Sequence, residues 1–258
     1  MSNLNLLAVS VGNTRTRVGS FVDGKLLEVS AFVNARSEKI GSAIDTAYAP
    51  LIDRPDASIL LSTVDPDRGD AVETIIRKQL GQDVFRVERD MPIPVGRQLD
   101  REAIVGEDRL LNAAAAYDKL KQSCVIVDAG TAMTIDLVDG EGTFHGGAIV
   151  PGAQLMLDAL GQRAAQLPEI ELRKPEEVVG HNTAEAMLSG VFYGMRGMVR
   201  ELVEQYATEA GQFPLVIATG GDAQVLFREC DIVERVVPDL TLWGIAVTLR
   251  AALEQAEG

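Results

Sequence analysis

The sequence contains 258 residues, of which 47% are hydrophobic, which is enough for one large globular domain or two of ordinary size. Its formal net charge of -14 disfavours bulk attraction to nucleic acid and to anionic membrane surfaces, so we expect neither as a partner. No apolar run approaches the roughly 20 residues that span a bilayer. The first residues also lack a basic leader with a cleavage site, so we expect a cytoplasmic protein.

The few cysteines and histidines argue against a metal centre built from these residues. Cys124 and Cys230 lie in apolar stretches without the spacing of metal ligands, which predicts buried thiols in a reducing compartment. His145 and His181 have neither a cysteine nor a second histidine at ligand spacing. A zinc site and a histidine-based catalytic triad are therefore disfavoured.

The first half of the chain alternates strand and helix patterns, which is typical of an α/β layer. The expected elements, in chain order, are a strand over 4–12, a hairpin over 16–32, a helix over 38–51, a strand over 57–64 and a helix over 70–80. The hairpin is predicted from Asp23-Gly24, because this dipeptide favours a tight two-residue turn.

The second half repeats this pattern over residues 124–150. Aligned with the start of the chain, Asp128-Ala129-Gly130 falls on Ser10-Val11-Gly12, and residues 138–140 fall on residues 22–24. Two matched hairpin units suggest a duplicated domain, in which each copy offers a phosphate-facing loop to a cleft between the copies.

An Ala-rich helix pattern over 104–120 lies between the two copies, with Asp108 near its start. We place the domain boundary just after it, which predicts an N-terminal domain over 1–121 and a C-terminal domain over 122–258. A long helix over 182–206 carries Ala186, Gly190 and Gly194 at every fourth position, a stripe that serves internal packing or a subunit interface. A strand, a Gly-Gly turn and a helix follow over 214–227, and a last helix over 240–256.

Three glycine turns that follow apolar strands are the candidates for binding phosphate: Gly12-Asn13-Thr14, Gly130-Thr131 and Gly220-Gly221. Glycine lets backbone N–H groups approach an anion, and Thr or Asn adds a side-chain donor. A strand that simply ends in a turn gives the same pattern, but the first two turns occupy matching places of the repeat. Neither a Walker A loop nor a GxGxxG motif is present, which disfavours P-loop and Rossmann enzymes.

Two carboxylates stand out near these turns. The stretch GEDR, Gly106 to Arg109, combines a carboxylate with a cation within one helical turn, as a phosphoryl-transfer site requires, although a solvated first turn of a helix has the same composition. Asp128 follows the apolar run CVIV, so its carboxylate is expected to be held at a strand end, where a cation or a turn would satisfy it.

The sequence resembles the type III pantothenate kinases, a branch of the superfamily of acetate and sugar kinases and actin. Six motifs in the family's order carry the resemblance, which spans nearly the whole chain: VGNTRTRVG from Val11, GEDRLLNAAAA from Gly106, VDAGTAMTIDLVD from Val127, GGAIVPG from Gly146, GHNTAEAMLSGVFYG from Gly180 and ATGGD from Ala218. It implies an α/β fold of duplicated ribonuclease H-like (actin-like ATPase) domains with mixed sheets flanked by helices, assembled as a homodimer. The implied reaction is ATP-dependent phosphorylation of pantothenate, the first step of coenzyme A biosynthesis.

The resemblance also implies roles for individual residues. Asp108 is similar to the proton acceptor, and Asp128 to a ligand of a monovalent cation, K+ or NH4+. Pantothenate contacts are implied for Gly106, Glu107, Asp108 and Arg109, and for Thr183 across the dimer interface. Contacts to ATP, which binds with Mg2+, are implied for Ser10, Gly12, Asn13, Thr14, Arg15, Gly130, Thr131, Gly220 and Gly221.

Two departures from the family pattern touch the site. Ser10 stands where the motif Asp-x-Gly-Asn-Thr has the aspartate that helps to place Mg2+, and Asp136 is a candidate to replace it only if its side of the strand faces the cleft. Leu99 and Arg101-Glu102 stand near the places of a tyrosine and an Asn-Pro pair. Two alternatives therefore remain: a catalytically impaired regulatory or ligand-binding member, and a kinase for another hydroxylated acceptor.

Overall fold

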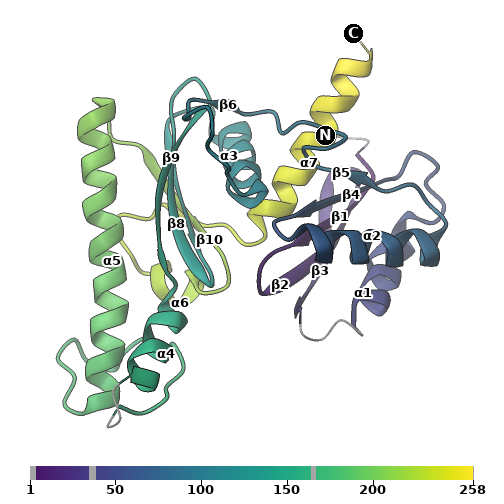
Figure 1. Ribbon diagram of the computed structural model, residues 1–258. Helices are drawn as coiled ribbons and strands as arrows, with labels where there is room; N and C mark the ends of the chain where they lie inside the picture. The colour runs from purple at the N-terminus through teal and green to yellow at the C-terminus, as the bar shows by residue number, and fades with distance from the viewer. Residues whose placement is uncertain (1–3, 35–38, 164–166, 258) are drawn as a thin grey trace. The chain divides into compact units, whose positions relative to one another are not determined.

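The computed structural model describes residues 4–34, 39–163 and 167–257, and its chain divides into two compact units (Figure 1). The first unit comprises Met1–Val95, Glu102–Asp118 and Leu240–Gly258; the second comprises Gly96–Arg101 and Lys119–Asp239. Compared with a division into 1–121 and 122–258, Gly96–Arg101 belongs to the second unit and Leu240–Gly258 to the first. The terminal helix packs on the first sheet, and residues Gly96–Arg97 pair with a strand of the second sheet.

The first sheet has five strands in the order β3-β2-β1-β4-β5. Their bounds are β1 Leu6–Val11, β2 Arg15–Val22, β3 Lys25–Val33, β4 Ser58–Thr63 and β5 Phe85–Arg86. Strand β1 runs antiparallel to β2 and parallel to β4, so the sheet is mixed. The side chains of β1 are almost all buried, as its continuous apolar sequence predicts.

The second sheet has six strands in the order β11-β10-β7-β8-β9-β6. Their bounds are β6 Gly96–Arg97, β7 Cys124–Ala129, β8 Ala132–Val138, β9 Thr143–Pro151, β10 Leu215–Thr219 and β11 Arg235–Val236. Strand β7 runs antiparallel to β8 and parallel to β10. Reading the order from β9 to β11 reproduces the order from β3 to β5 in the first sheet, with β6 added at one edge. The duplication predicted from the sequence is therefore confirmed.

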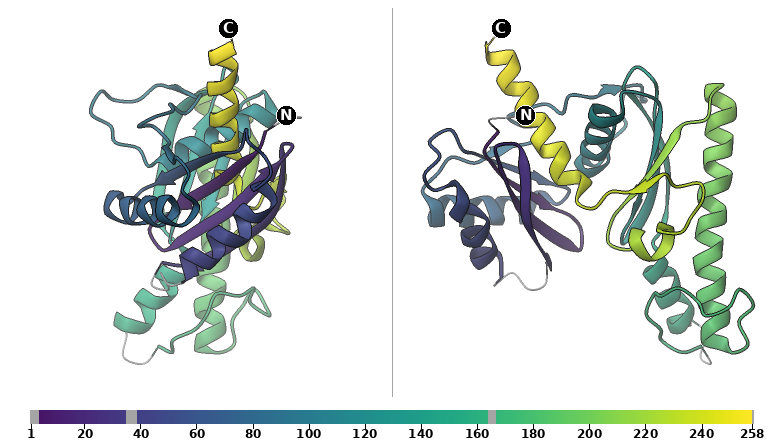
Figure 2. Two further views of the ribbon diagram at one scale, coloured as in Figure 1. Left: turned by 90° about the vertical axis from the view of Figure 1, so that its right-hand side faces the viewer. Right: turned by 180° about the vertical axis from the view of Figure 1, so that it is seen from behind.

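Helices cover both sheets (Figure 2). Their bounds are α1 Lys39–Tyr48, followed by a 3-10 turn over Ala49–Leu51, α2 Pro66–Leu80, α3 Glu107–Leu120, α4 Ala153–Arg163, α5 Thr183–Ala210, α6 Ala223–Phe227 and α7 Leu240–Glu257. In the first unit α1 packs on β2 and β3, α2 on β4, and α7 on β1, β2 and β4. In the second unit α5 packs on β8, α4 and α6. Sequence reasoning missed α4, although the Pro151-Gly152 dipeptide directly before it is a turn signal.

Capping residues explain where two of the helices begin. The Asp65 side chain accepts a hydrogen bond from the Arg68 N–H at 3.1 Å, and Pro66 takes the first position of α2, so this helix begins four residues before the expected start. Asn182 accepts from the Glu185 N–H at 2.9 Å and caps α5, as the sequence predicted.

The two hairpins use different turns. Asp23 and Gly24 both have positive φ, 51° and 74°, the conformation that an Asp-Gly hairpin turn requires. The second turn spans residues 139–142 and places its positive φ, 85°, at Gly142 rather than at Gly140. The Asp139 carboxylate accepts from the N–H groups of Glu141 and Thr143 and so stabilises this longer turn.

Each unit has its own apolar core. One cluster joins β1, β2 and β4 with α1 and α2, and the other joins β7, β8 and β10 with α4, α5 and α6. Cys124 and Cys230 are buried free thiols, as expected, and burial raises the pKa of the Cys124 thiol to about 12. Among the described helices, none is long and apolar enough to cross a bilayer.

Candidate functional site

The first glycine turn is held by the residues around it. The Gly12 N–H donates to the Arg15 carbonyl at 3.0 Å, and the Asn34 side chain donates to the carbonyls of Gly12 and Asn13 at 2.8 and 3.1 Å. Arg68 donates to the same Asn13 carbonyl at 3.0 Å. The side chains of Asn13, Thr14 and Arg15 are exposed. The loop thus uses its carbonyls for internal support and presents a basic, donor-rich surface, which suits an anion.

Ser10 lies at the end of β1, in register with Ser62 on the parallel strand β4. Paired residues of neighbouring strands project from the same face of a sheet, so the two serines share a face. A carboxylate from α3 reaches this face: the Ser62 hydroxyl donates to Glu107 Oε2 at 2.7 Å, and the Thr63 N–H donates to the same oxygen at 3.0 Å. Burial raises the pKa of Glu107, although these hydrogen bonds oppose the shift.

Gly106 and Asp108 form a compact turn at the start of α3. The Asp108 Oδ1 atom accepts from the Arg109 N–H at 2.9 Å, and a Cβ on Gly106 would lie only 2.5 Å from that oxygen. The glycine is therefore what allows the Asp108 carboxylate to fold back over the helix start. Burial raises the pKa of Asp108, while the N–H hydrogen bond and Arg109 lower it. A carboxyl group shifted upward is a better proton acceptor than an ordinary surface aspartate.

The second glycine turn is supported by glycines from two other segments. The Gly130 N–H donates to the Ala132 carbonyl at 3.1 Å, and the Gly152 N–H to the Thr131 carbonyl at 3.0 Å. A Cβ on Gly152 would lie 2.0 Å from the Gly130 carbonyl oxygen, so only glycine fits there. Sequence reasoning gave Gly152 no role, although the motif GGAIVPG contains it.

Asp128 and Thr219 end the two central parallel strands of the second sheet and lie in register. Gly220, with φ of 96°, packs so closely that a Cβ on it would lie 2.5 Å from Asp128 Oδ1 and 2.3 Å from the Ala129 carbonyl oxygen. The structure therefore brings the Gly220-Gly221 turn to the same edge of the second sheet as the Gly130-Thr131 turn.

Both edges offer oxygen donors of the kind that hard cations prefer. The Thr219 hydroxyl is buried and has no hydrogen-bond partner among the described residues, and it lies beside Asp128, so this donor set fits a monovalent cation. Glu107 with Ser10 and Ser62 is an oxygen-only set that fits Mg2+. Within the described ranges no cluster of three His, Cys, Asp or Glu side chains is suited to a metal.

The remaining candidates lie elsewhere. Thr183 is exposed at the first residue of α5, and His181 is exposed and pairs with Glu177 at 3.0 Å, the surface role that its context suggests. Asp136 is buried on β8 of the second sheet, two residues from Thr134, which pairs with Asp128. It therefore lies opposite Ile126 in the middle of the second sheet, and not in the sheet that carries Ser10.

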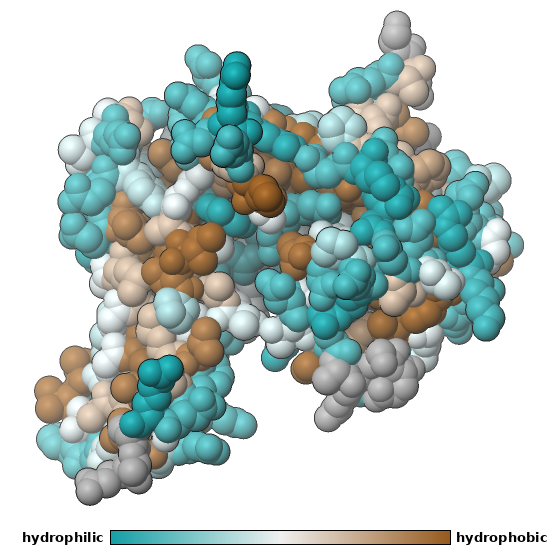
Figure 3. Space-filling model, in the orientation of Figure 1, coloured by the Kyte–Doolittle hydropathy of each residue, from teal (hydrophilic) through white to brown (hydrophobic). Residues whose placement is uncertain are grey.

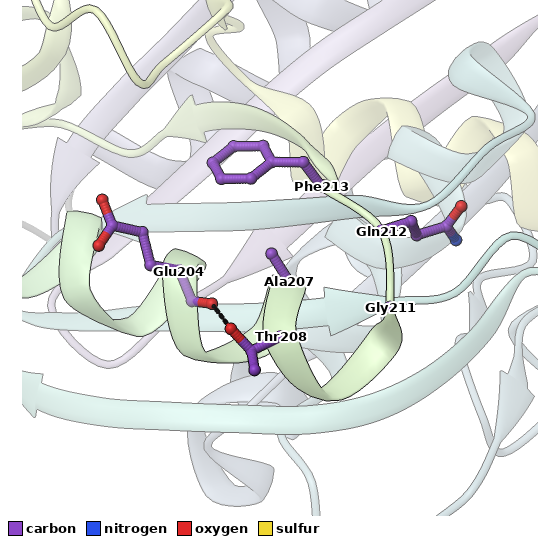
Figure 4. A pocket seen from close by; sticks show the side chains of 6 residues that line it. All are labelled: Glu204, Ala207, Thr208, Gly211, Gln212 and Phe213. Carbon is purple, nitrogen blue, oxygen red and sulfur yellow. Dashed lines mark hydrogen bonds between the residues drawn. The ribbon is translucent and has the colours of Figure 1, made fainter.

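A hollow of about 420 Å³ lies at the C-terminal end of α5 (Figure 4). The residues lining it are Glu204, Ala207, Thr208, Gly211, Gln212 and Phe213. Its polar contact, from the Thr208 hydroxyl to the Glu204 carbonyl at 2.9 Å, is internal to the helix. None of the predicted site residues contributes to it, so we assign the hollow no part in the chemistry.

Solved structures with the same architecture come from proteins of diverse description. A conserved protein of Campylobacter jejuni described as a Baf family transcriptional activator superposes with a TM-score of 0.61 at 18% identity, covering 96% of this chain and 99% of that one. Component A of the (R)-2-hydroxyglutaryl-CoA dehydratase of Acidaminococcus fermentans superposes with a TM-score of 0.56 at 15% identity, covering 99% and 100%. At these identities the likeness shows the fold alone, and the predicted actin-like α/β fold is confirmed.

Sequence comparison is more specific. The family described as "Type III pantothenate kinase" matches residues 6–205. Proteins of that name from Syntrophotalea carbinolica and Pelobacter propionicus are 35% and 36% identical to this chain, each alignment covering 94% of this chain and 97% of the relative. The match spans both phosphate loops, the GEDR turn and most of α5. The chain belongs to the type III pantothenate kinase family.

Proposed function

We propose that this protein transfers the γ-phosphoryl group of ATP to the primary hydroxyl of pantothenate, giving 4'-phosphopantothenate and ADP. Family membership supports the kinase activity, the use of ATP and the acceptor. The observation that carries the proposal is the Asp108 turn, in which a half-buried carboxylate with a raised pKa is held over Gly106 at a helix start.

Asp108 acts as the proton acceptor. It takes the proton of the pantothenate hydroxyl as the hydroxyl oxygen bonds to the γ-phosphorus and the bond to the bridging oxygen of ADP breaks. Arg109 is the cation of the same turn and holds the acceptor, together with Gly106 and with Thr183 from a second subunit. The Glu107 carboxylate is held against β4 through Oε2, and we do not assign it to pantothenate.

The two glycine loops hold the nucleotide. The first contributes Gly12, Asn13, Thr14 and Arg15, and the second contributes Gly130, Thr131, Gly220 and Gly221. The N–H groups of Gly12 and Gly130 are used within their turns, so the other backbone N–H groups and the hydroxyls of these loops bind the phosphates, which an acidic protein can only attract locally. Mg2+ supplies charge neutralisation at the β- and γ-phosphates when it is bound with ATP. Asp128 and Thr219 provide the oxygens for K+ or NH4+.

We further propose a cytoplasmic homodimer that pairs through α5. A Cβ added to Gly190, Gly194 or Gly197 would meet nothing within 4 Å, so this glycine face of α5 is open. Apolar residues form patches on the surface of the second unit (Figure 3), and Val178 and Val179, just before α5, are 63% and 69% exposed. An open glycine face flanked by apolar side chains suits close approach of a second helix.

A coupled assay for ADP release tests the proposal, using MgATP, a potassium or ammonium salt and pantothenate. We expect pantothenate-dependent turnover that falls by about 10²–10⁴-fold in Asp108→Asn. Asp53→Asn, an exposed aspartate of the same unit, is the matched control and should retain turnover. Absence of turnover in the native protein with pantothenate and with other hydroxylated acceptors would refute the kinase assignment. Activity that appears only in Ser10→Asp would favour the regulatory alternative.

A further inference from the structure

Glu107 is a carboxylate of the GEDR turn to which the proposed reaction gives no role. Its carboxylate is half-buried on the inner side of the GEDR turn, where it receives hydrogen bonds from Ser62 and Thr63. Both hydrogen bonds end on Oε2, so Oε1 accepts none from any residue in the described ranges. Glu107 also forms no ion pair with a described residue. The charge of the Arg86 guanidinium acts on this carboxylate, but Arg86 is already paired with Asp70 and Glu73, so Oε1 of Glu107 is left open to a further cation.

The register of the sheet places this carboxylate beside the first phosphate loop. Ser62 and Ser10 are direct neighbours on parallel strands, which lie about 4.8 Å apart. The chain leaving β4 is tied to β1, because the Val64 N–H donates to the Val11 carbonyl at 3.1 Å, immediately before Gly12. A group bound to Ser62 and Thr63 therefore lies one strand away from Ser10 and next to the turn that we assign to the nucleotide phosphates.

The second unit shows what stands in the corresponding place. Asp128 and Thr219 are in register there as Ser10 and Ser62 are in the first unit, so each edge combines one hydroxyl residue on the parallel neighbour with a carboxylate. In the second unit the carboxylate comes from the strand itself. In the first it comes from α3 and reaches across to the strand end.

We propose that Glu107 supplies the carboxylate that positions the divalent cation of MgATP, in place of the one that Ser10 lacks. This assignment rests on the proposed kinase function. It makes the motif GEDR bifunctional: Glu107 faces the nucleotide metal and Asp108 faces the acceptor. It also predicts that Ser10 does not abolish metal binding, because the negative charge is present one strand away.

Metal-dependent nucleotide binding tests this assignment without turnover. Binding of a non-hydrolysable ATP analogue is measured by calorimetry with EDTA and with Mn2+, and bound Mn2+ is counted by electron paramagnetic resonance. We expect Mn2+ to raise the affinity of the native protein for the analogue, and we call the ratio of the affinities with Mn2+ and with EDTA the Mn2+ gain. In Glu107→Gln the Mn2+ gain should be smaller by about tenfold or more, while the affinity for the analogue in EDTA should not change. Glu28→Gln, an exposed glutamate on β3, is the matched control and should keep the whole gain.

Moving the carboxylate to another position by a double substitution gives a second test. In the double variant Ser10→Asp/Glu107→Gln the carboxylate moves onto β1, and the Mn2+ gain should return. If Glu107→Gln does not fold, Glu107→Asp keeps the charge but shortens its reach, and at least a threefold loss is expected. An unchanged Mn2+ gain in the folded Glu107 variant overturns the inference, even if pantothenate-dependent turnover is intact. If the native protein binds neither the nucleotide analogue nor pantothenate, the kinase function itself is refuted.

Discussion

The Gly12 and Gly130 loops have the same strand order around them but differ in how the carboxylate beside each loop is supplied. In the first unit Val11 pairs with Thr16, so four residues form the turn; in the second Ala129 pairs with Met133, and three residues suffice. The first edge carries Ser10 with Glu107 delivered by α3, and the second carries Asp128 from the strand.

The supporting residues differ as well. The first loop is held by side chains, Asn34 and Arg68, that bind its carbonyls. The second is held by close backbone contact with Gly152 and Gly220, where no side chain fits. A loop supported by side chains tolerates change in its own residues, whereas a loop supported by glycine contacts does not. The first prediction tests this difference in support, and the later ones test the groups beside each loop and the Asp108 turn.

Alanine at the supporting glycine should have the largest effect. In Gly220→Ala the new Cβ would lie 2.3 Å from the Ala129 carbonyl oxygen, and the φ of 96° is one that alanine rarely adopts. We expect a loss of about 3 kcal/mol in the free energy of unfolding, measured by urea denaturation. Gly12→Ala meets only the Arg15 carbonyl, at 3.2 Å, and should lose less than about 1 kcal/mol. Equal losses would contradict the distinction between the two loops.

Removal of the Ser62 hydroxyl tests the first edge. Ser62→Ala deletes a donor to the Glu107 carboxylate, and hydrogen bonds to charged groups contribute about 1.5–3 kcal/mol. The free energy of unfolding should fall by about that amount, and the affinity for Mn2+ with nucleotide should fall too, because Glu107 loses one of its two positioning contacts. Ser42→Ala, an exposed serine on α1, serves as the control. A destabilised variant with unaltered Mn2+ affinity would limit Ser62 to a structural role.

Sequence reasoning predicted the elements and the duplication well, because apolar strand patterns and Asp-Gly turns are local signals. It also matched the Gly12 turn to the Gly130 turn through the repeat, whereas the place of Gly220 beside Asp128 and Ala129 came only from the structure. It did not foresee that Glu107 binds β4, because neighbouring residues on a helix point in different directions and only the packing of α3 decides which faces the sheet. Gly152 and Thr219 were missed for a similar reason: their importance depends on contacts with residues about twenty and ninety positions away.

Gly106→Ala tests the position of Asp108 and should affect kcat rather than stability, unlike the substitutions in the two loops. The new Cβ would lie 2.5 Å from Asp108 Oδ1, and a side-chain carboxylate can rotate away, so the stability should change little. Displacement of the proton acceptor should lower kcat by about tenfold or more, equivalent to roughly 1.4 kcal/mol of transition-state free energy. Steady-state kinetics with a thermal melt as the folding control measures this. Unaltered kcat would show that the position of Asp108 over Gly106 is not the reactive one.

Thr219→Val should change the free energy of unfolding least. The change should be an increase, whereas Ser62→Ala should cause a decrease, although Thr219 on β10 and Ser62 on β4 occupy equivalent places in the two sheets. The Ser62 hydroxyl has a partner, whereas the buried Thr219 hydroxyl has none among the described residues. In a buffer without K+ or NH4+, valine removes an unsatisfied buried group at almost constant volume and should stabilise the protein by about 1 kcal/mol. If the hydroxyl is a cation ligand beside Asp128, added K+ should raise the melting temperature of the native protein more than that of the variant. The same K+ response in both proteins would remove Thr219 from the cation site and leave Asp128 to be tested alone.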